Sequence, residues 1–163
     1  ASHIRHIIHE FKYNHKYKLA EYIGKKLGEK IRLHKKWELD VIIPVPLHYL
    51  KKIERGYNQS DMICKGLEKE IGIKRDNKVL KRIKYTDSQT TLSIRNRKRN
   101  IRSAFQVKNN SRLKGKSVLL IDDVVTTGTT VLECAKVLYK AGTKEIFLAS
   151  IARAKPHQKK TII

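Results

Sequence analysis

The segment VLLIDDVVTTGTTVLECAKVL, residues 118–138, decides the fold class and places the main candidate site of this protein. It begins with four apolar residues, as expected of a strand that is buried on both faces of a sheet. Two adjacent acids, Asp122 and Asp123, come next, and a Thr/Gly cluster then leads into a helix-like stretch. In open α/β sheets, ligands bind outside the carboxyl end of a strand, where a loop enters a helix. The segment therefore predicts a ligand site between this strand and this helix.

The Thr/Gly cluster has the properties of a loop that binds a monophosphate. Gly128 lets the backbone approach an anion closely and adopt unusual φ/ψ values. The N–H groups at a helix start point at such an anion, and the helix dipole favours negative charge there. The hydroxyls that could add further donors belong to Thr126, Thr127, Thr129 and Thr130. No lysine follows the glycine, so the cluster does not match the Walker-type triphosphate loop.

Two carboxylates at the rim of a phosphate loop point to a sugar phosphate, because acids in this position can accept hydrogen bonds from vicinal hydroxyls. The alternative is that Asp122 and Asp123 merely begin a capped turn in which Thr129 or Thr130 is the N-cap. One capping acid would suffice for such a turn. Two acids in succession, followed by four threonines and a glycine, favour the ligand site.

Basic residues dominate the charge of the chain. Its 37 Lys and Arg stand against 15 Asp and Glu, which gives a formal net charge of +22. A field of this sign attracts polyanions and accelerates their encounter with the protein. Nucleic acid, a polyphosphate metabolite and an anionic membrane surface all fit as partners, and so does the alternative of a plain solvated, lysine-rich surface.

The two cysteines, Cys64 and Cys134, lie far apart and form no CxxC pair. We therefore expect no zinc in this chain, no disulfide scaffold, and a reducing cytoplasmic environment. No apolar run approaches membrane-spanning length, and His and Lys interrupt the first apolar residues, unlike in a signal peptide. The prediction is a cytoplasmic protein without membrane insertion, which partners could bring to the inner face of the membrane.

Alternating strands and helices predict an α/β fold. The predicted helices cover 4–11, 18–33, the stretch from Asn58 to Gly72, and 129–141. The predicted strands cover 40–43, 79–83, 117–121 and 145–152. The nearly continuous apolar runs 118–121 and 146–151 predict that these two strands are buried on both faces. Pro44 and Pro46 should end the first strand because neither can donate to a ladder. This order implies βαβ units and a mostly parallel sheet covered by helices on both faces. The length of the chain predicts a single domain, residues 1–163, with leading helices in 1–35 and a frayed tail at 153–163.

Several motifs together resemble a known family. LLIDDVVTTGTT resembles the phosphoribosyl pyrophosphate (PRPP) signature of type I phosphoribosyltransferases. PVPLH at Pro44–His48 and RGYNQ at Arg55–Gln59 precede it in order. The pattern T-x2-Q-x2-L-x4-R-x2-N-x3-AF is met by Thr86, Gln89, Leu92, Arg97, Asn100 and Ala104–Phe105. With IRHIIHEFKY as a leading helix, nearly the whole chain is similar to the ComF family, the amidophosphoribosyltransferase-like competence proteins.

The resemblance implies a type I phosphoribosyltransferase fold and a role for each motif. Asp122 and Asp123 would bind the ribose 2′ and 3′ hydroxyls of PRPP and hold Mg²⁺ indirectly. Residues 126–130 would hold the 5′-phosphate. A pyrophosphate loop would be formed by Pro44, Val45, Pro46, Leu47 and His48. A mobile hood, residues 84–104, would close over PRPP, and the residues expected to serve the pyrophosphate and the hood are Arg55, Asn58, Gln59, Gln89 and Arg97.

The cations of the hood leave three interpretations open: a solvated face, a diphosphate clamp or a DNA contact. We assign a nucleic-acid contact to Arg95, Lys98, Arg99 and Arg102. His48 could equally be a buried turn histidine. The chain departs from the family pattern in three places: it lacks the four-cysteine zinc module of longer members, it has Leu50 and Ile53 where Arg is common, and it has Ser103 where Gly is frequent.

The resemblance implies a PRPP-binding phosphoribosyltransferase-like protein that acts in DNA uptake during natural transformation. Catalysis would displace pyrophosphate from the ribose C1, with an unknown acceptor, and no obvious general base stands near the PRPP signature. Two alternatives remain at this point. One is a non-catalytic module that senses PRPP or a nucleotide and binds single-stranded DNA, and the other is a structural partner of the uptake helicase.

Overall fold

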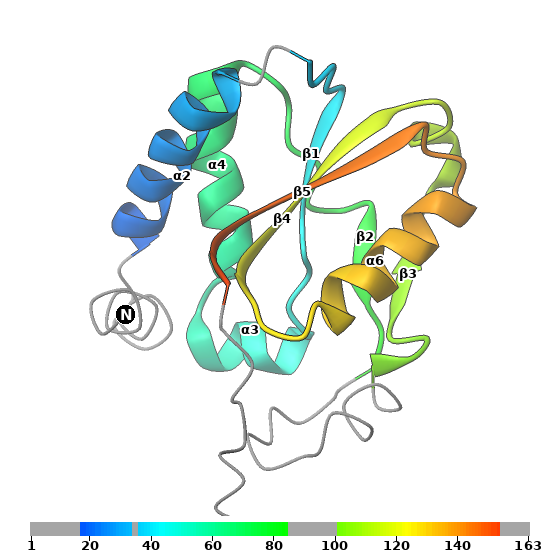
Figure 1. The fold of residues 1–163 in the computed structure, drawn as a ribbon. Helices are drawn as coiled ribbons and strands as arrows, with labels where there is room; N and C mark the ends of the chain where they lie inside the picture. Colours follow the sequence, from blue (N-terminus) through cyan, green and yellow to red (C-terminus); the bar gives the residue numbers. More distant parts are fainter. Residues whose placement is uncertain (1–16, 34–35, 85–100, 154–163) are drawn as a thin grey trace, which may run out of the picture.

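The computed structural model describes residues 17–33, 36–84 and 101–153. A parallel three-stranded sheet forms the centre, in the order β1 (Val41–Pro44), β4 (Ser117–Val125) and β5 (Glu145–Arg153). A separate antiparallel pair joins β2 (Leu80–Arg82) to β3 (Phe105–Val107). The helices are α2 (Tyr17–Arg32), α3 (Tyr49–Arg55), α4 (Gln59–Ile71) and α6 (Thr129–Lys140), with a 3-10 turn, η1, at Asn110–Arg112. Figure 1 shows α2 and α4 to one side of the sheet, and α6 with the β2–β3 pair to the other.

The alternation of side chains along the strands separates two hydrophobic cores. Ile42 of β1 and Leu119 and Ile121 of β4 pack against the α2–α4 helices. Their neighbours in the strands point the other way, toward α6 and the β2–β3 hairpin, and these residues are Val41, Ile43, Val118 and Leu120. Because both faces of β1 and β4 are covered, these strands read as continuous apolar runs in the sequence.

The α2–α4 layer is held together by close backbone contact and by ion pairs. Gly24 and Gly66 lie where the two helices cross, and neither position has space for a Cβ atom. Glu21 of α2 forms ion pairs with Lys65 (3.0 Å) and Lys69 (2.5 Å) of α4. The carboxylates of this layer are therefore largely neutralised within it.

Most of the predicted elements are confirmed, including the caps of α4. The Asn58 side chain accepts a hydrogen bond from the Ser60 N–H at the start of α4, and Gly72 ends it in the left-handed conformation (φ 74°). The predicted leading helix 4–11, most of the hood and all but the first residue of the predicted tail 153–163 lie outside the described residues.

β1 ends at Pro44, as predicted, although Pro44 is itself aligned with Ile121 and the Val45 N–H still donates to the Ile121 C=O (2.8 Å). Three details of the sequence prediction are wrong. β4 runs through both acids to Val125. Neither α3 nor β3 was predicted as an element. Within the described residues β5 is an edge strand, mostly half-buried, rather than a strand covered on both faces, and its apolar composition gave no sign of this.

Candidate functional site

Asp122 and Asp123 lie near the carboxyl end of β4, as predicted, but in different environments. Asp122 is almost completely buried (9% exposed), whereas Asp123 is half-buried. An Asp122 carboxylate oxygen accepts the Asp123 N–H (3.0 Å), and an Asp123 oxygen accepts the Val124 N–H (2.8 Å). These local bonds fix both carboxylates to the strand. Because successive side chains of a strand point to opposite faces, the two acids offer oxygens on two sides of the same strand end.

The loop after β4 turns at Gly128, the N-cap of α6. Gly128 has φ 76° and ψ −1°, a left-handed conformation that glycine adopts without steric cost. The Thr127 and Thr129 hydroxyls lie 2.9 Å apart, the Thr129 N–H makes a long hydrogen bond to the Thr127 hydroxyl (3.5 Å), and the N-cap residue itself provides no side-chain cap. The alternative prediction that Thr129 or Thr130 is the N-cap is therefore wrong. A loop whose helix start lacks a side-chain cap leaves backbone N–H groups for an anion.

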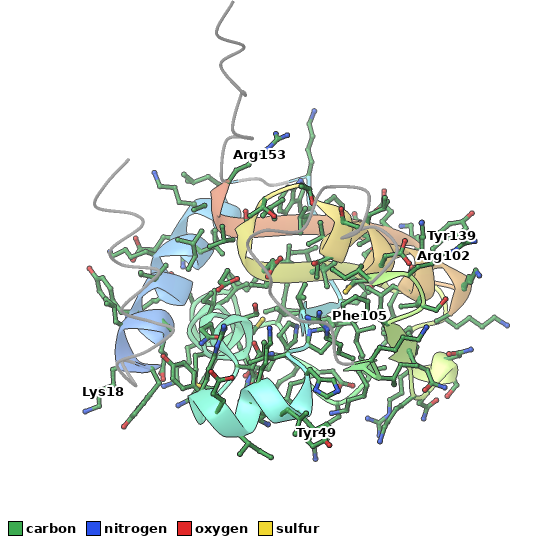
Figure 2. The ribbon with its side chains drawn as sticks, turned by 90° about the horizontal axis from the view of Figure 1, so that it is seen from below. Lys18, Tyr49, Arg102, Phe105, Tyr139 and Arg153 are labelled. Carbon is green, nitrogen blue, oxygen red and sulfur yellow. The ribbon has the colours of Figure 1, made fainter. Side chains whose placement is uncertain are left out.

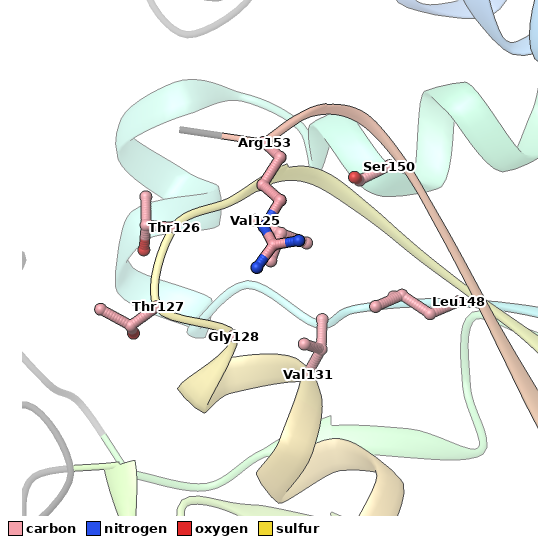
Figure 3. A pocket seen from close by; sticks show the side chains of 8 residues that line it. All are labelled: Val125, Thr126, Thr127, Gly128, Val131, Leu148, Ser150 and Arg153. Carbon is pink, nitrogen blue, oxygen red and sulfur yellow. The ribbon is translucent and has the colours of Figure 1, made fainter. Parts of the chain in front are cut away.

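A pocket of about 290 Å³ lies against this loop (Figure 3). Its lining residues are Val125, Thr126, Thr127, Gly128, Val131, Leu148, Ser150 and Arg153. Figure 3 shows Arg153, the last residue of β5, reaching across Val125 toward the loop. A guanidinium beside hydroxyls and a helix start forms an environment suited to a phosphate group. Arg153 was not among the predicted site residues, and its only signal in the sequence is that it ends an apolar strand beside β4.

The PVPLH segment leaves the sheet beside the two acids. Pro44 is aligned with Ile121, so the parallel strands β1 and β4 deliver their following residues to the same edge of the sheet. The side-chain amide of Asn58, the N-cap of α4, donates to the Val45 carbonyl (3.0 Å) and so ties the loop to the start of that helix. The predicted pyrophosphate loop and the predicted phosphate loop therefore lie at one edge, as Figure 1 also shows for the two strand ends.

His48 and Gln59 are both buried. His48 is the N-cap of α3, where its Nδ1 accepts the Leu50 N–H (3.4 Å) and its ring lies 4.7 Å from that of Tyr49. This contact gives His48 a structural role in the turn. Gln59 begins α4 and is only 2% exposed.

Arg55 ends α3 and is a stronger candidate for an anion contact. Its Nε is buried and has no hydrogen-bond partner within the described part of the chain. A buried donor without a partner is costly, and a bound anion would satisfy it. Arg55 ends the short helix that directly follows the PVPLH loop, where the resemblance places a diphosphate.

Arg82 is the other residue that the sequence reasoning missed. It lies on β2, and its guanidinium carbon is 5.6 Å from the centre of the Phe105 ring on β3. Burial lowers the pKa of Arg82, while the nearby Cys134 and Asp122 favour its charged form. Asp122, the more buried of the two acids, thus favours the charged form of Arg82. The sequence places Arg82 forty residues before Asp122, and no spacing rule connects the two.

The remaining site predictions fall largely outside the described residues. These are Gln89, Arg95, Arg97, Lys98 and Arg99. Arg102 is described and exposed, and its carbonyl accepts a hydrogen bond from the Lys84 ammonium (3.4 Å). In the described ranges no three His, Cys, Asp or Glu side chains come together as a metal site. The two carboxylates of β4 could contribute oxygens to a divalent cation such as Mg²⁺, which usually keeps several waters and takes only one or two carboxylates from a protein.

Residues 21–162 match the family described as the phosphoribosyl transferase domain. Competence protein F of Haemophilus influenzae is 34% identical over 153 residues, covering 91% of this chain and 67% of that protein. DNA utilization protein YhgH of Escherichia coli K12 is 32% identical over 152 residues, covering 90% and 66%. The chain belongs to the phosphoribosyltransferase domain family, among the ComF-type homologues. It spans about two thirds of the length of these relatives.

Solved structures confirm the type I phosphoribosyltransferase fold. An allosteric regulatory enzyme of purine biosynthesis superposes with a TM-score of 0.56 at 21% identity, over 86% of this chain and 29% of that one. A hypoxanthine phosphoribosyltransferase from Staphylococcus aureus gives 0.54 at 20% identity, over 88% and 67%. At these identities the similarity establishes the fold alone. None of the helices in the described ranges is long and apolar enough to cross a bilayer.

Proposed function

We propose that this chain binds PRPP with Mg²⁺ and acts in DNA uptake during natural transformation. The observation that carries the proposal is the meeting of two acids, an uncapped Thr/Gly loop and the PVPLH turn at one edge of the sheet. The names of its relatives, competence protein F and DNA utilization protein, support the role in DNA handling.

Each part of the site has a role in this proposal. Asp122 and Asp123 accept hydrogen bonds from the ribose hydroxyls and hold Mg²⁺ together with PRPP. The Thr126–Thr130 loop binds the 5′-phosphate through backbone N–H groups and hydroxyls. Arg55, whose Nε lacks a partner in the described residues, pairs with the diphosphate beside the Pro44–His48 loop. Bound Mg²⁺ would supply charge neutralisation for the diphosphate.

If the chain catalyses a transfer, the bond that breaks joins the ribose C1 to the pyrophosphate oxygen, and the bond that forms joins C1 to the acceptor. The leaving diphosphate takes the electron pair, and the ribosyl carbon becomes oxocarbenium-like in between. The chain contributes fixed charges and dipoles around this state rather than a covalent intermediate. In this proposal the Asp122 and Asp123 carboxylates hold the ribose still as its C1 changes geometry.

Calorimetric titration of PRPP with Mg²⁺ tests the proposal. The parent should bind, and Asp122→Asn/Asp123→Asn should bind at least tenfold more weakly, because each lost charged hydrogen bond is worth about 1.5–3 kcal/mol. Glu38→Gln/Glu145→Gln is the matched control, since it removes two exposed acids, one of which begins β5 at the opposite end of the sheet. A folded parent that binds no PRPP would overturn the proposal. Pyrophosphate release measured with a panel of acceptors then separates a transferase from a non-catalytic sensor.

A further inference from the structure

The charges of this fold are distributed unequally between its two sides. On the α2–α4 side, acids and bases are paired, as in Glu21 with two lysines and Arg75 with both Asp61 and Glu68. On the other side, the hairpin residues 77–84 and 101–108 contain no acid at all. Their six basic residues are Lys78, Lys81, Arg82, Lys84, Arg102 and Lys108.

Lys81 and Lys108 lie on the same face of the β2–β3 pair, because Lys81 is aligned with Gln106 and Lys108 stands two residues after Gln106, with its N–H donating to the Val79 carbonyl (2.8 Å). We call Lys52 of α3 with Lys78, Lys81 and Lys108 of the hairpin the basic face. The pKa of Lys81 is lowered by its burial and by the charges of Lys108, Lys52 and Lys78, against an opposing effect of Asp76. The acid near them is already engaged, since Asp76 accepts two backbone N–H bonds and pairs with Arg112 (3.6 Å).

An exposed aromatic ring adjoins the basic face. Tyr49 is 64% exposed and stands three residues before Lys52, so the two share a side of α3. Figure 2 shows Tyr49 at the outer edge of the molecule, directed away from the sheet. Cations that follow a backbone, together with an aromatic ring on which a base can stack, are the features by which proteins bind single strands.

We propose that the basic face and Tyr49 form a binding surface for single-stranded nucleic acid. The lysines contact the phosphodiester backbone, and the Tyr49 ring stacks on an unpaired base. This inference deepens the DNA-related part of the proposed function, and it does not depend on whether the chain binds PRPP. Its residues are distinct from those assigned to the PRPP site.

Fluorescence anisotropy with a labelled oligothymidylate of about 20 nucleotides tests the proposal across a salt series. The variant Lys52→Gln/Lys81→Gln/Lys108→Gln should lower the slope of log K against log salt by about 2, since each single-strand phosphate contact contributes about 0.7. The matched control, Lys18→Gln/Lys25→Gln/Lys30→Gln, removes the same charge from exposed positions of α2. It should change the slope by much less. Equal slopes for the two variants would overturn the proposed location.

Tyr49→Ala tests the stacking contact. Single-strand affinity should fall about fivefold or more, while affinity for a duplex of the same length should barely change. Equal losses for single strand and duplex, or none for either, would overturn the single-strand assignment in favour of a general polyanion surface. PRPP titration of the three-lysine variant separates this surface from the proposed PRPP site. A variant that still binds PRPP but no longer binds DNA supports the surface. A variant that binds neither ligand would mean that the lysines act through the PRPP site.

Discussion

The crossing of α2 and α4 makes a sharp prediction for Gly66→Ala. A Cβ atom at position 66 would lie 2.8 Å from the Glu21 carbonyl carbon and 2.9 Å from the Lys25 backbone nitrogen, and closer still to the Glu21 carbonyl oxygen. All of these are backbone atoms of α2, so no side-chain rotation can relieve the contact. The substitution therefore forces the two helices apart.

Two effects of opposite sign decide the magnitude. Alanine in place of glycine in a helix interior stabilises it by about 1 kcal/mol. Overpacking a core costs about 1–3 kcal/mol and occasionally more, and separating the helices also loosens the fully buried Ala20, Ile63 and Leu67. Because the clash is with backbone, we expect packing to prevail, with a net loss of about 2 kcal/mol in the free energy of unfolding. For a chain of this size that lowers Tm by about 4–8 °C.

Urea unfolding followed by far-UV circular dichroism measures this loss. Gly28→Ala is the comparison, because its Cβ would meet side-chain atoms of Glu70 (2.7 and 2.8 Å) and Leu67 (3.2 Å) rather than backbone. It should lose less stability than Gly66→Ala. A Gly66→Ala protein as stable as the parent, or more stable, would show that propensity outweighs packing here and would refute the backbone contact between α2 and α4.

Three further predictions concern the site and the cores. Gly128→Ala places a side chain at φ 76°, a conformation that costs a non-glycine residue about 1–2 kcal/mol. The affinity for PRPP, measured by calorimetry, should therefore fall about tenfold. Unchanged affinity would argue against this loop as the phosphate site. Arg82→Met removes the guanidinium that lies 5.6 Å from the centre of the Phe105 ring and should lower the unfolding free energy by about 0.5–2 kcal/mol, with Arg82→Lys recovering part of the loss in denaturant titrations. Burial raises the pKa of both the Cys64 and Cys134 thiols, so iodoacetamide at about pH 8 should label them only as the protein unfolds. The contribution of these two thiols to the free energy of unfolding should be full below about pH 8.5 and decline above it. Rapid labelling of the folded protein would contradict this burial.

The sequence was informative wherever a local rule applied. The apolar run of β4, the adjacent acids and the glycine before α6 predicted the strand, the site edge and the turn, because each depends on neighbouring residues. Asn58 and Gly72 predicted the ends of α4 for the same reason. α3 was missed because its seven residues expose Tyr49 and Ile53 and so lack an apolar stripe. β3 was missed because three residues are too few for a period to be read.

What the sequence by itself determined was the family, the parallel α/β architecture and the position of the Thr/Gly loop between β4 and α6, since these reside in short-range patterns and ordered motifs. What only the tertiary structure decided was which distant residues share a place. Arg82 lies over the Phe105 ring, Arg153 lines the pocket at the Thr/Gly loop, and Lys81 and Lys108 come to one face of the β2–β3 pair. These juxtapositions depend on how strands align and helices cross, and that is settled by packing between segments far apart in the chain.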